Sequence, residues 1–198
     1  MSPRGVATPD VRERLFAAAE RVLDRDGPGA LTSRAVTAEA DCAKGLLHAH
    51  FAGLDEFVAD LVLDRFARAA RQAEQLSARA GQDTVADNLL AVALTLLTST
   101  SPTIAGVALT RPGASLRIRR ALQGGAPGFG SIQDTVTRYL DAEQRLGRVA
   151  ATADTGSLAL ALIGTTHHLL MTGYGADGPD LQRQLRDLVA TLARAATP

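Results

Sequence analysis

The sequence lacks the residues from which several classes of protein are built. A single cysteine, Cys42, excludes an intramolecular disulfide framework and a zinc site made of several cysteines. Tryptophan is absent, aromatic residues make up 4% of the chain, and Lys44 is the only lysine among 21 basic residues. The 21 acidic residues cancel this charge, so the net charge does not indicate a polyanionic partner.

Charged residues are missing from two long runs, residues 88–110 and 155–176. Each is longer than the roughly 20 residues that cross a bilayer. The first run has hydroxyl residues and a proline at its centre, the second contains His167 and His168, and neither is flanked by basic clusters. We therefore expect buried helices of a soluble protein. The N-terminus shows no apolar signal segment, which predicts a cytoplasmic location.

Apolar residues, 46% of the chain, recur at the three- and four-residue spacing of helices, and strand patterns are almost absent. The spacing and the Gly and Pro positions predict helices over residues 9–26, 32–40, 43–51, 54–79, 84–99, 102–110, 114–122, 131–146, 152–172 and 179–195. The predicted fold class is all-α, with three short helices followed by a larger helical body.

The second and third predicted helices are separated only by a tight turn, which is the pattern of a helix-turn-helix. In such a motif the third helix must be short and slender enough to enter the major groove of DNA. Its inner side must be apolar, and we assign Leu47, Phe51 and Cys42 to that side. Its outer side must offer groups to phosphates and bases.

Three segments carry a resemblance to a known family: residues 14–19 (Arg-Leu-Phe-Ala-Ala-Ala), residues 29–32 (Gly-Ala-Leu-Thr) and residues 40–51 (Ala-Asp-Cys-Ala-Lys-Gly-Leu-Leu-His-Ala-His-Phe). Together with Asp55-Glu56-Phe57 they resemble the N-terminal domain of TetR-family transcriptional regulators. The resemblance implies a helix-turn-helix DNA-binding domain over residues 1–53 and a helical effector-binding and dimerisation domain over residues 54–198.

The resemblance implies a homodimeric DNA-binding repressor that a small-molecule effector releases from double-stranded operator DNA. In the family, the residues matching Thr32 and Lys44 contact phosphates, and the glycine matching Gly45 lets the backbone approach DNA. The DNA-binding residues implied by the resemblance are Thr32, Ser33, Arg34, Lys44, Gly45, Leu46, His48, Ala49 and His50.

Three positions depart from the family pattern. Ala43 stands where a serine is usual, His48 where tyrosine is common, and Leu54 where a lysine often contacts the DNA backbone. Each lost phosphate contact reduces the salt dependence of binding by about one unit of slope. The alternative is therefore a helical dimeric sensor or scaffold with a degenerate, weakly DNA-binding head.

The remaining candidates lie in the C-terminal body. His167 and His168 point about 100° apart on a helix, so the pair is a poor metal chelate, and a pocket, an interface and plain packing all stay open. We expect an aliphatic cavity, and the candidate pocket residues are Phe66, Arg111, Phe129, Tyr139, His167 and Tyr174. The last two helices are the candidate dimer interface, through Leu158, Leu162, Gly164, Leu181, Leu185, Leu188 and Leu192.

An enzyme is the competing class of function. The sequence shows no phosphate-binding glycine loop, no His-Glu metal spacing and no nucleophile elbow. We therefore expect no catalytic activity, no cofactor and no metal site, and we expect DNA, an effector and a second copy of the chain as partners.

Overall fold

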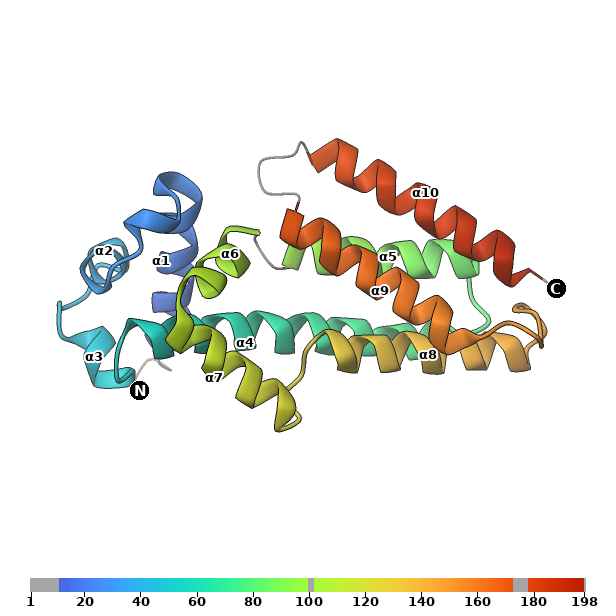
Figure 1. The fold of residues 1–198 in the computed structure, drawn as a ribbon, viewed down its shortest axis with the longest axis horizontal. Coiled ribbons are helices and arrows are strands. Elements are labelled where there is room, and N and C mark those ends of the chain that lie inside the picture. The colour runs from blue at the N-terminus through green and yellow to red at the C-terminus, as the bar shows by residue number, and fades with distance from the viewer. Residues whose placement is uncertain (1–10, 100–101, 173–177, 198) are drawn as a thin grey trace, which may run out of the picture. The chain divides into compact units, whose positions relative to one another are not determined.

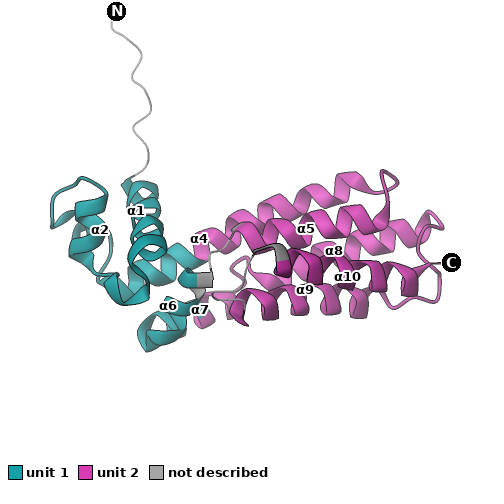
Figure 2. Cartoon of the chain, turned by 90° about the horizontal axis from the view of Figure 1, so that it is seen from above, with its two compact units in different colours: residues 1–62, 103–118 teal, residues 63–102, 119–198 magenta. Residues whose placement is uncertain are grey.

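The computed structural model describes residues 11–99, 102–172 and 178–197, and over these ranges it contains ten α-helices and no strand (Figure 1). The all-α prediction is confirmed. None of the described helices is both long enough and apolar enough to cross a membrane. Two compact units divide the chain, residues 1–62 with 103–118 and residues 63–102 with 119–198 (Figure 2).

The first unit contains the three short N-terminal helices, the start of α4, α6 and most of α7. The bounds are α1 Val11–Asp26, the 3₁₀ turn η1 Pro28–Ala30, α2 Ser33–Glu39, α3 Leu46–His50, α4 Leu54–Glu74, α6 Pro102–Thr110 and α7 Pro112–Gln123. The start expected for the first helix at residue 9 lies outside the described residues. The functional boundary expected at residues 53 and 54 stays a prediction.

The second unit is a helical bundle made of the rest of α4, the end of α7 and four further helical elements. These are η2 Gln75–Arg79, α5 Val85–Ser99, α8 Phe129–Arg145, α9 Thr155–Thr172 and α10 Gly178–Ala196. Helix α9 packs against α5, α8 and α10, and α10 also packs against α5.

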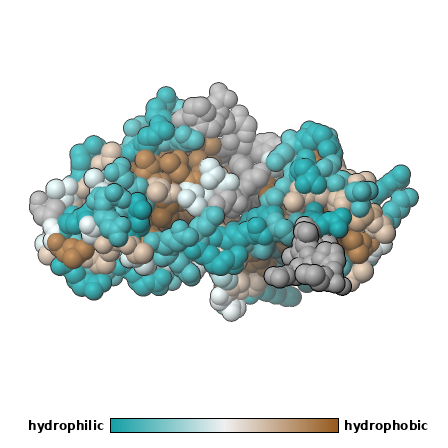
Figure 3. Space-filling view, turned by 180° about the vertical axis from the view of Figure 1, so that it is seen from behind, coloured by the Kyte–Doolittle hydropathy of each residue, from teal (hydrophilic) through white to brown (hydrophobic). Residues whose placement is uncertain are grey.

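The bundle core takes one apolar stripe from each helix. Ile132, Val136 and Tyr139 from α8 meet Leu162 from α9 and Leu185 from α10. Some apolar side chains are only partly enclosed: Leu90, Leu94 and Leu97 of α5 pack against this core but stay partly exposed. Figure 3 shows apolar areas, in brown, within the mostly hydrophilic surface.

Helix α3 is shorter than expected. Residues 43–51 were predicted to be helical, but the described helix covers only Leu46–His50 because Lys44 and Gly45 form a turn before it. The long helix predicted over residues 54–79 is not α-helical throughout, since α4 ends at Glu74 and Gln75–Arg79 form the 3₁₀ helix η2.

Candidate functional site

The N-terminal helices are held together by an aromatic cluster. The ring centroids of Phe16 and Phe51 lie 6.0 Å apart, those of Phe16 and Phe57 5.5 Å, and those of Phe51 and Phe57 5.0 Å in an edge-to-face arrangement. All three side chains are buried, as is Leu47 in the middle of α3. Aromatic pairs at these distances add to the gain from burial. The cluster therefore fixes which side of α3 faces inward.

The turn between α2 and α3 has the backbone geometry that its sequence favours. Thr32 caps α2, because its hydroxyl oxygen accepts a hydrogen bond from the Ala35 N–H at 3.1 Å. Asp41 takes a left-handed conformation with φ of 48°, which Asp adopts more readily than most residues. The Cys42 N–H then donates to the Thr37 carbonyl at 3.0 Å. These bonds bring the chain around so that α3 follows directly.

The side chain of Cys42 is half-buried, and its Sγ lies 3.5 Å from the Thr37 carbonyl oxygen. The cysteine thus packs partly against α2.

Salt bridges brace α1 against α2. Arg21 Nε and Arg25 NH1 donate to the two carboxylate oxygens of Glu39 at 2.7 and 2.8 Å, and these hydrogen bonds lower the pKa of Glu39. Arg14 donates to the Ala40 carbonyl at 3.0 Å, at the end of α2. The arginines of α1 nearest the turn are therefore engaged in holding α2.

Arg12 is held in the same way at the other end of α1. Its guanidinium lies 4.7 Å from the Phe51 ring centroid and 2.6 Å from the Asp60 carboxylate. A cation over an aromatic face is attracted by the ring electrons. Arg12 thereby links α1, the end of α3 and α4.

The outer side of α3 carries the residues that sequence reasoning selected. Lys44, Gly45, His48, Ala49 and His50 are exposed, and Leu46 is half-buried. On α2 and its cap, Thr32 and Arg34 are exposed and Ser33 is half-buried. The fold thus brings all nine predicted DNA-binding residues to two adjoining short helices and the turns beside them.

Two cations of this group are uncommitted. Within the described part of the chain, neither Arg34 nor Lys44 makes an ion pair, whereas Arg12, Arg21 and Arg25 of α1 do. Gly45 is open as well, since a Cβ built on it would meet no atom within 4 Å. The surface therefore offers two free positive charges and an accessible stretch of backbone.

Helix α3 begins without a side-chain cap. Its N-cap residue is Gly45, and no side-chain hydrogen bond satisfies the first N–H groups of the helix. Ala43, which replaces the usual serine, has no hydroxyl to supply one. The N–H of Leu46, the first residue of α3, instead donates to the Ala43 carbonyl at 2.9 Å.

Of the six predicted pocket residues, three come together. The Phe66 and Phe129 rings lie 5.2 Å apart, and the Phe129 and His167 rings 4.6 Å. Burial, with a smaller contribution from His168, lowers the pKa of His167.

The other three predicted pocket residues are elsewhere. Tyr139 is 1% exposed, and its hydroxyl accepts a hydrogen bond from Asn88 Nδ2 at 3.0 Å. Arg111 lies in the first unit, where NH1 donates to Asp55 Oδ1 at 3.0 Å. Tyr174 lies outside the described residues.

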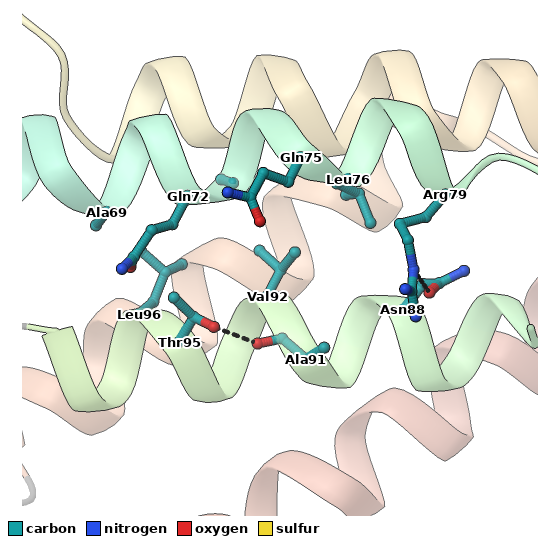
Figure 4. Close-up of a pocket in the computed structure, with 11 residues that line it drawn as sticks. Ala69, Gln72, Gln75, Leu76, Arg79, Asn88, Ala91, Val92, Thr95 and Leu96 are labelled. Carbon is teal, nitrogen blue, oxygen red and sulfur yellow. Dashed lines mark hydrogen bonds between the residues drawn. The ribbon is translucent and has the colours of Figure 1, made fainter.

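A cavity that sequence reasoning missed lies between α4 and α5. Its volume is about 270 Å³, and it is lined by Ala69, Gln72, Ala73, Gln75, Leu76, Arg79, Asn88, Ala91, Val92, Thr95 and Leu96 (Figure 4). None of the predicted pocket residues lines it, because most of those residues are aromatic, whereas the walls are aliphatic, as expected of the cavity, and polar. The sequence feature that could have indicated the cavity is the alternation of alanine and glutamine in Ala69, Gln72, Ala73 and Gln75, at the end of α4 and the start of η2.

The predicted dimer residues divide between core and surface. Leu162, Leu181 and Leu185 are buried in the core of their own unit, and Leu158, Leu188 and Leu192 are half-buried against it. Gly164 is exposed, as is its neighbour on α9, Leu160, at 57%. The buried leucines pack within one chain, and the dimer interface stays a prediction.

Two short helices at a tight turn, with the free cations Arg34 on the first helix and Lys44 in the turn, define a helix-turn-helix domain. Residues 15–61 match the family model described as bacterial regulatory proteins, tetR family. The resemblance inferred from the sequence is confirmed: this part of the chain is a TetR-type helix-turn-helix domain, and the whole chain has the TetR fold.

Solved structures with this fold cover nearly the whole chain. A protein of Mesorhizobium loti MAFF303099, described as a TetR-family transcriptional regulator, is 14% identical with a TM-score of 0.72, over 94% of this chain and 96% of that one. SmeT, the repressor of the Stenotrophomonas maltophilia multidrug efflux pump SmeDEF, is 20% identical with a TM-score of 0.62, over 96% and 92%.

FadR of Bacillus subtilis, solved in complex with stearoyl-CoA, is 13% identical with a TM-score of 0.66, over 91% of this chain and 97% of that one. No curated protein matches the chain in sequence.

Proposed function

We propose that this protein is a DNA-binding transcriptional regulator that acts as a homodimer in the cytoplasm and represses its target until a small-molecule effector releases it. The observation that carries the proposal is the geometry of α3. Leu47 within the helix and Phe51 at its C-cap are buried, while His48 and His50 on the helix and Lys44 in the turn before it are exposed. Such a helix can enter the major groove without losing its packing.

The surroundings of α3 support this proposal in electrostatic terms. Arg34 and Lys44 are free for phosphates, and Gly45 leaves the backbone beside Lys44 open to a close approach. The effector part of the proposal rests on the cavity between α4 and α5. SmeT and FadR, which share the fold, are described as a repressor and as a regulator seen with a bound acyl-CoA.

The test is binding of the purified protein to duplex DNA from the region around its own coding sequence, measured by fluorescence anisotropy from low to moderate salt. We expect specific binding that weakens with salt, as counterions are released from phosphates. The Lys44→Ala variant should bind more weakly and, because a dimer loses one phosphate contact in each copy, lower the slope of log K against log salt by about two units.

Arg186→Ala is the matched control for this experiment. Arg186 is an exposed cation on α10, in the second unit, and its removal changes the net charge by the same amount. We expect wild-type binding and an unchanged salt slope from this variant. A Lys44→Ala variant that matches it would remove Lys44 from the interface.

The second candidate function is a helical sensor or scaffold whose head no longer binds DNA. The observation in its favour is the missing cap of α3, where Gly45 makes no side-chain bond and Ala43 cannot supply one. The same titration separates the two functions, since a scaffold would show no preference for this DNA over an unrelated duplex even at low salt.

A further inference from the structure

The cavity between α4 and α5 has an apolar floor and polar edges. Ala69, Ala73 and Leu76 from one helix and Val92 and Leu96 from the other are buried beneath it. Gln72, Gln75 and Ala91 are exposed at its mouth, so the cavity opens to solvent. The floor is aliphatic and has no aromatic ring, which suits a saturated chain better than a stacked ring.

One end of the cavity is positively charged. Arg79 and Asn88 close this end together, with Arg79 Nε donating to Asn88 Oδ1 at 3.3 Å (Figure 4). Arg79 is the only charged side chain among the lining residues. A ligand with a negative head and an aliphatic body therefore complements the cavity at both ends.

The present partner of Arg79 is exchangeable. Arg79 NH2 lies 2.6 Å from Asp83 Oδ2, but the two side chains are 51% and 55% exposed. Ion pairs this exposed contribute little to stability. A carboxylate entering the cavity can thus replace Asp83 at the guanidinium without a large loss, and it gains a bidentate partner.

Arg79 is also held ready for such a ligand. Asn88, which accepts from it, is 2% exposed, and its Nδ2 donates to the Gln82 carbonyl at 2.9 Å and to the Tyr139 hydroxyl at 3.0 Å. Tyr139 is in turn hydrogen-bonded to the fully buried Glu143. A side chain fixed by buried neighbours loses less freedom when a ligand binds.

Resting on the proposed function, we propose that the effector is an aliphatic carboxylate of medium length, bound between α4 and α5 with its carboxylate on Arg79. At about 30 Å³ for each water-sized group, the 270 Å³ cavity holds about nine such groups. Octanoate, with ten non-hydrogen atoms, is the natural probe. The glutamines and Thr95 line the path of its chain toward the opening.

The test is calorimetric titration of the full-length protein with octanoate, with 1-octanol and octylamine as probes of the same length. We expect octanoate to bind and the amine not to. Arg79→Gln should weaken octanoate binding about tenfold or more, which is the scale of a lost charge-assisted hydrogen bond. Arg71→Gln removes an exposed arginine of α4 that does not line the cavity, and it should bind like the wild type.

A second variant tests the position of the ligand without touching Arg79. Ala91→Trp places a large side chain at the exposed mouth of the cavity and should abolish binding while the thermal unfolding midpoint stays close to that of the wild type. Equal binding of octanoate and 1-octanol, or full binding by either Arg79→Gln or Ala91→Trp, would overturn the proposal.

The same preparations are assayed for DNA binding with and without octanoate. Octanoate should weaken DNA binding by the wild type and leave Arg79→Gln unaffected. Binding to DNA without any binding of octanoate refutes the ligand and leaves the regulator standing. Binding of octanoate without any binding to DNA refutes the regulator instead, so the two failures are distinguishable.

Discussion

Removing Arg148 should destabilise the protein much more than removing Glu143, although the two side chains form one ion pair. Glu143 Oε2 lies 3.1 Å from Arg148 Nε, and the glutamate side chain is 0% exposed whereas the arginine keeps 29%. The other glutamate oxygen accepts a hydrogen bond from the Gly81 N–H at 3.1 Å. Removing the arginine therefore leaves a buried charge without its partner, while removing the glutamate leaves an arginine that water can still reach.

The structure gives a magnitude to each loss. An uncompensated buried charge costs about 3–5 kcal/mol, so Arg148→Met should lower the free energy of unfolding by about that amount. Glu143→Gln keeps an acceptor for the Gly81 N–H and loses an ion pair to an arginine that water still reaches, so it should cost only about 1 kcal/mol. In the Glu143→Gln background, Arg148→Met should cost only about 1 kcal/mol, because the buried charge has gone.

The assay is urea unfolding followed by circular dichroism, at one protein concentration for the wild type, the two single variants and the double variant. The slope m should stay constant across the four proteins, which shows that the midpoints report stability. A Glu143→Gln variant as unstable as Arg148→Met, or additive effects in the double variant, would refute the reasoning from unequal burial.

Three further predictions concern other contacts. Burial lowers the pKa of His167 from its ordinary 6.5, so near and below that pH the unfolded chain binds more protons than the folded one, and the free energy of unfolding should fall as the pH drops below 6.5. His167→Gln should make the free energy of unfolding less dependent on pH, as measured by urea unfolding at a series of pH values. Replacing glycine by alanine in a helix usually raises the free energy of unfolding by about 0.5–1 kcal/mol, but in Gly113→Ala the new methyl group would lie 2.3 Å from Asp55 Oδ2. Urea unfolding should therefore show this gain only when Asp55→Ala removes the clashing carboxylate. Leu160→Asp should raise the dimer dissociation constant at least tenfold in analytical ultracentrifugation, whereas Leu146→Asp, at the same 57% exposure, should not.

Most of the helices could be predicted because their ends are marked locally. Gly27 has φ of 79° and ends α1, and Thr32 caps α2 as its sequence position indicates. Pro102 begins α6, and the predicted range 102–110 agrees with the observed one. The start of α3 was placed too early, because Lys44 and Gly45 carry no residue that distinguishes a turn from a first helical turn.

The inner and outer sides of α3 could also be predicted, because they depend only on the spacing of residues close together in the sequence. Leu47 and Phe51 are four residues apart, so one side of a short helix must be apolar and the rest must face outward. The cavity could not be found in this way. It exists because Ala69 and Ala73 on α4 oppose Ala91 and Val92 on α5 with few side-chain atoms between them, and the register of two helices distant in sequence is not visible in either one.

The interface prediction shows where a hydrophobic stripe alone is ambiguous. Helix α10 repeats leucine at 181, 185, 188 and 192, a pattern that serves equally for packing within a chain and between chains. In the structure Leu181 and Leu185 are enclosed by their own unit, whereas Leu188 and Leu192 are only half-buried against it. Helix α9 differs because it is apolar on nearly every side, and burying Leu162 still leaves Leu160 57% exposed. The exposure of Leu160 does not by itself require a partner, but it lies on a helix without Asp, Glu, Lys or Arg, so we propose that a second copy of the chain covers this face.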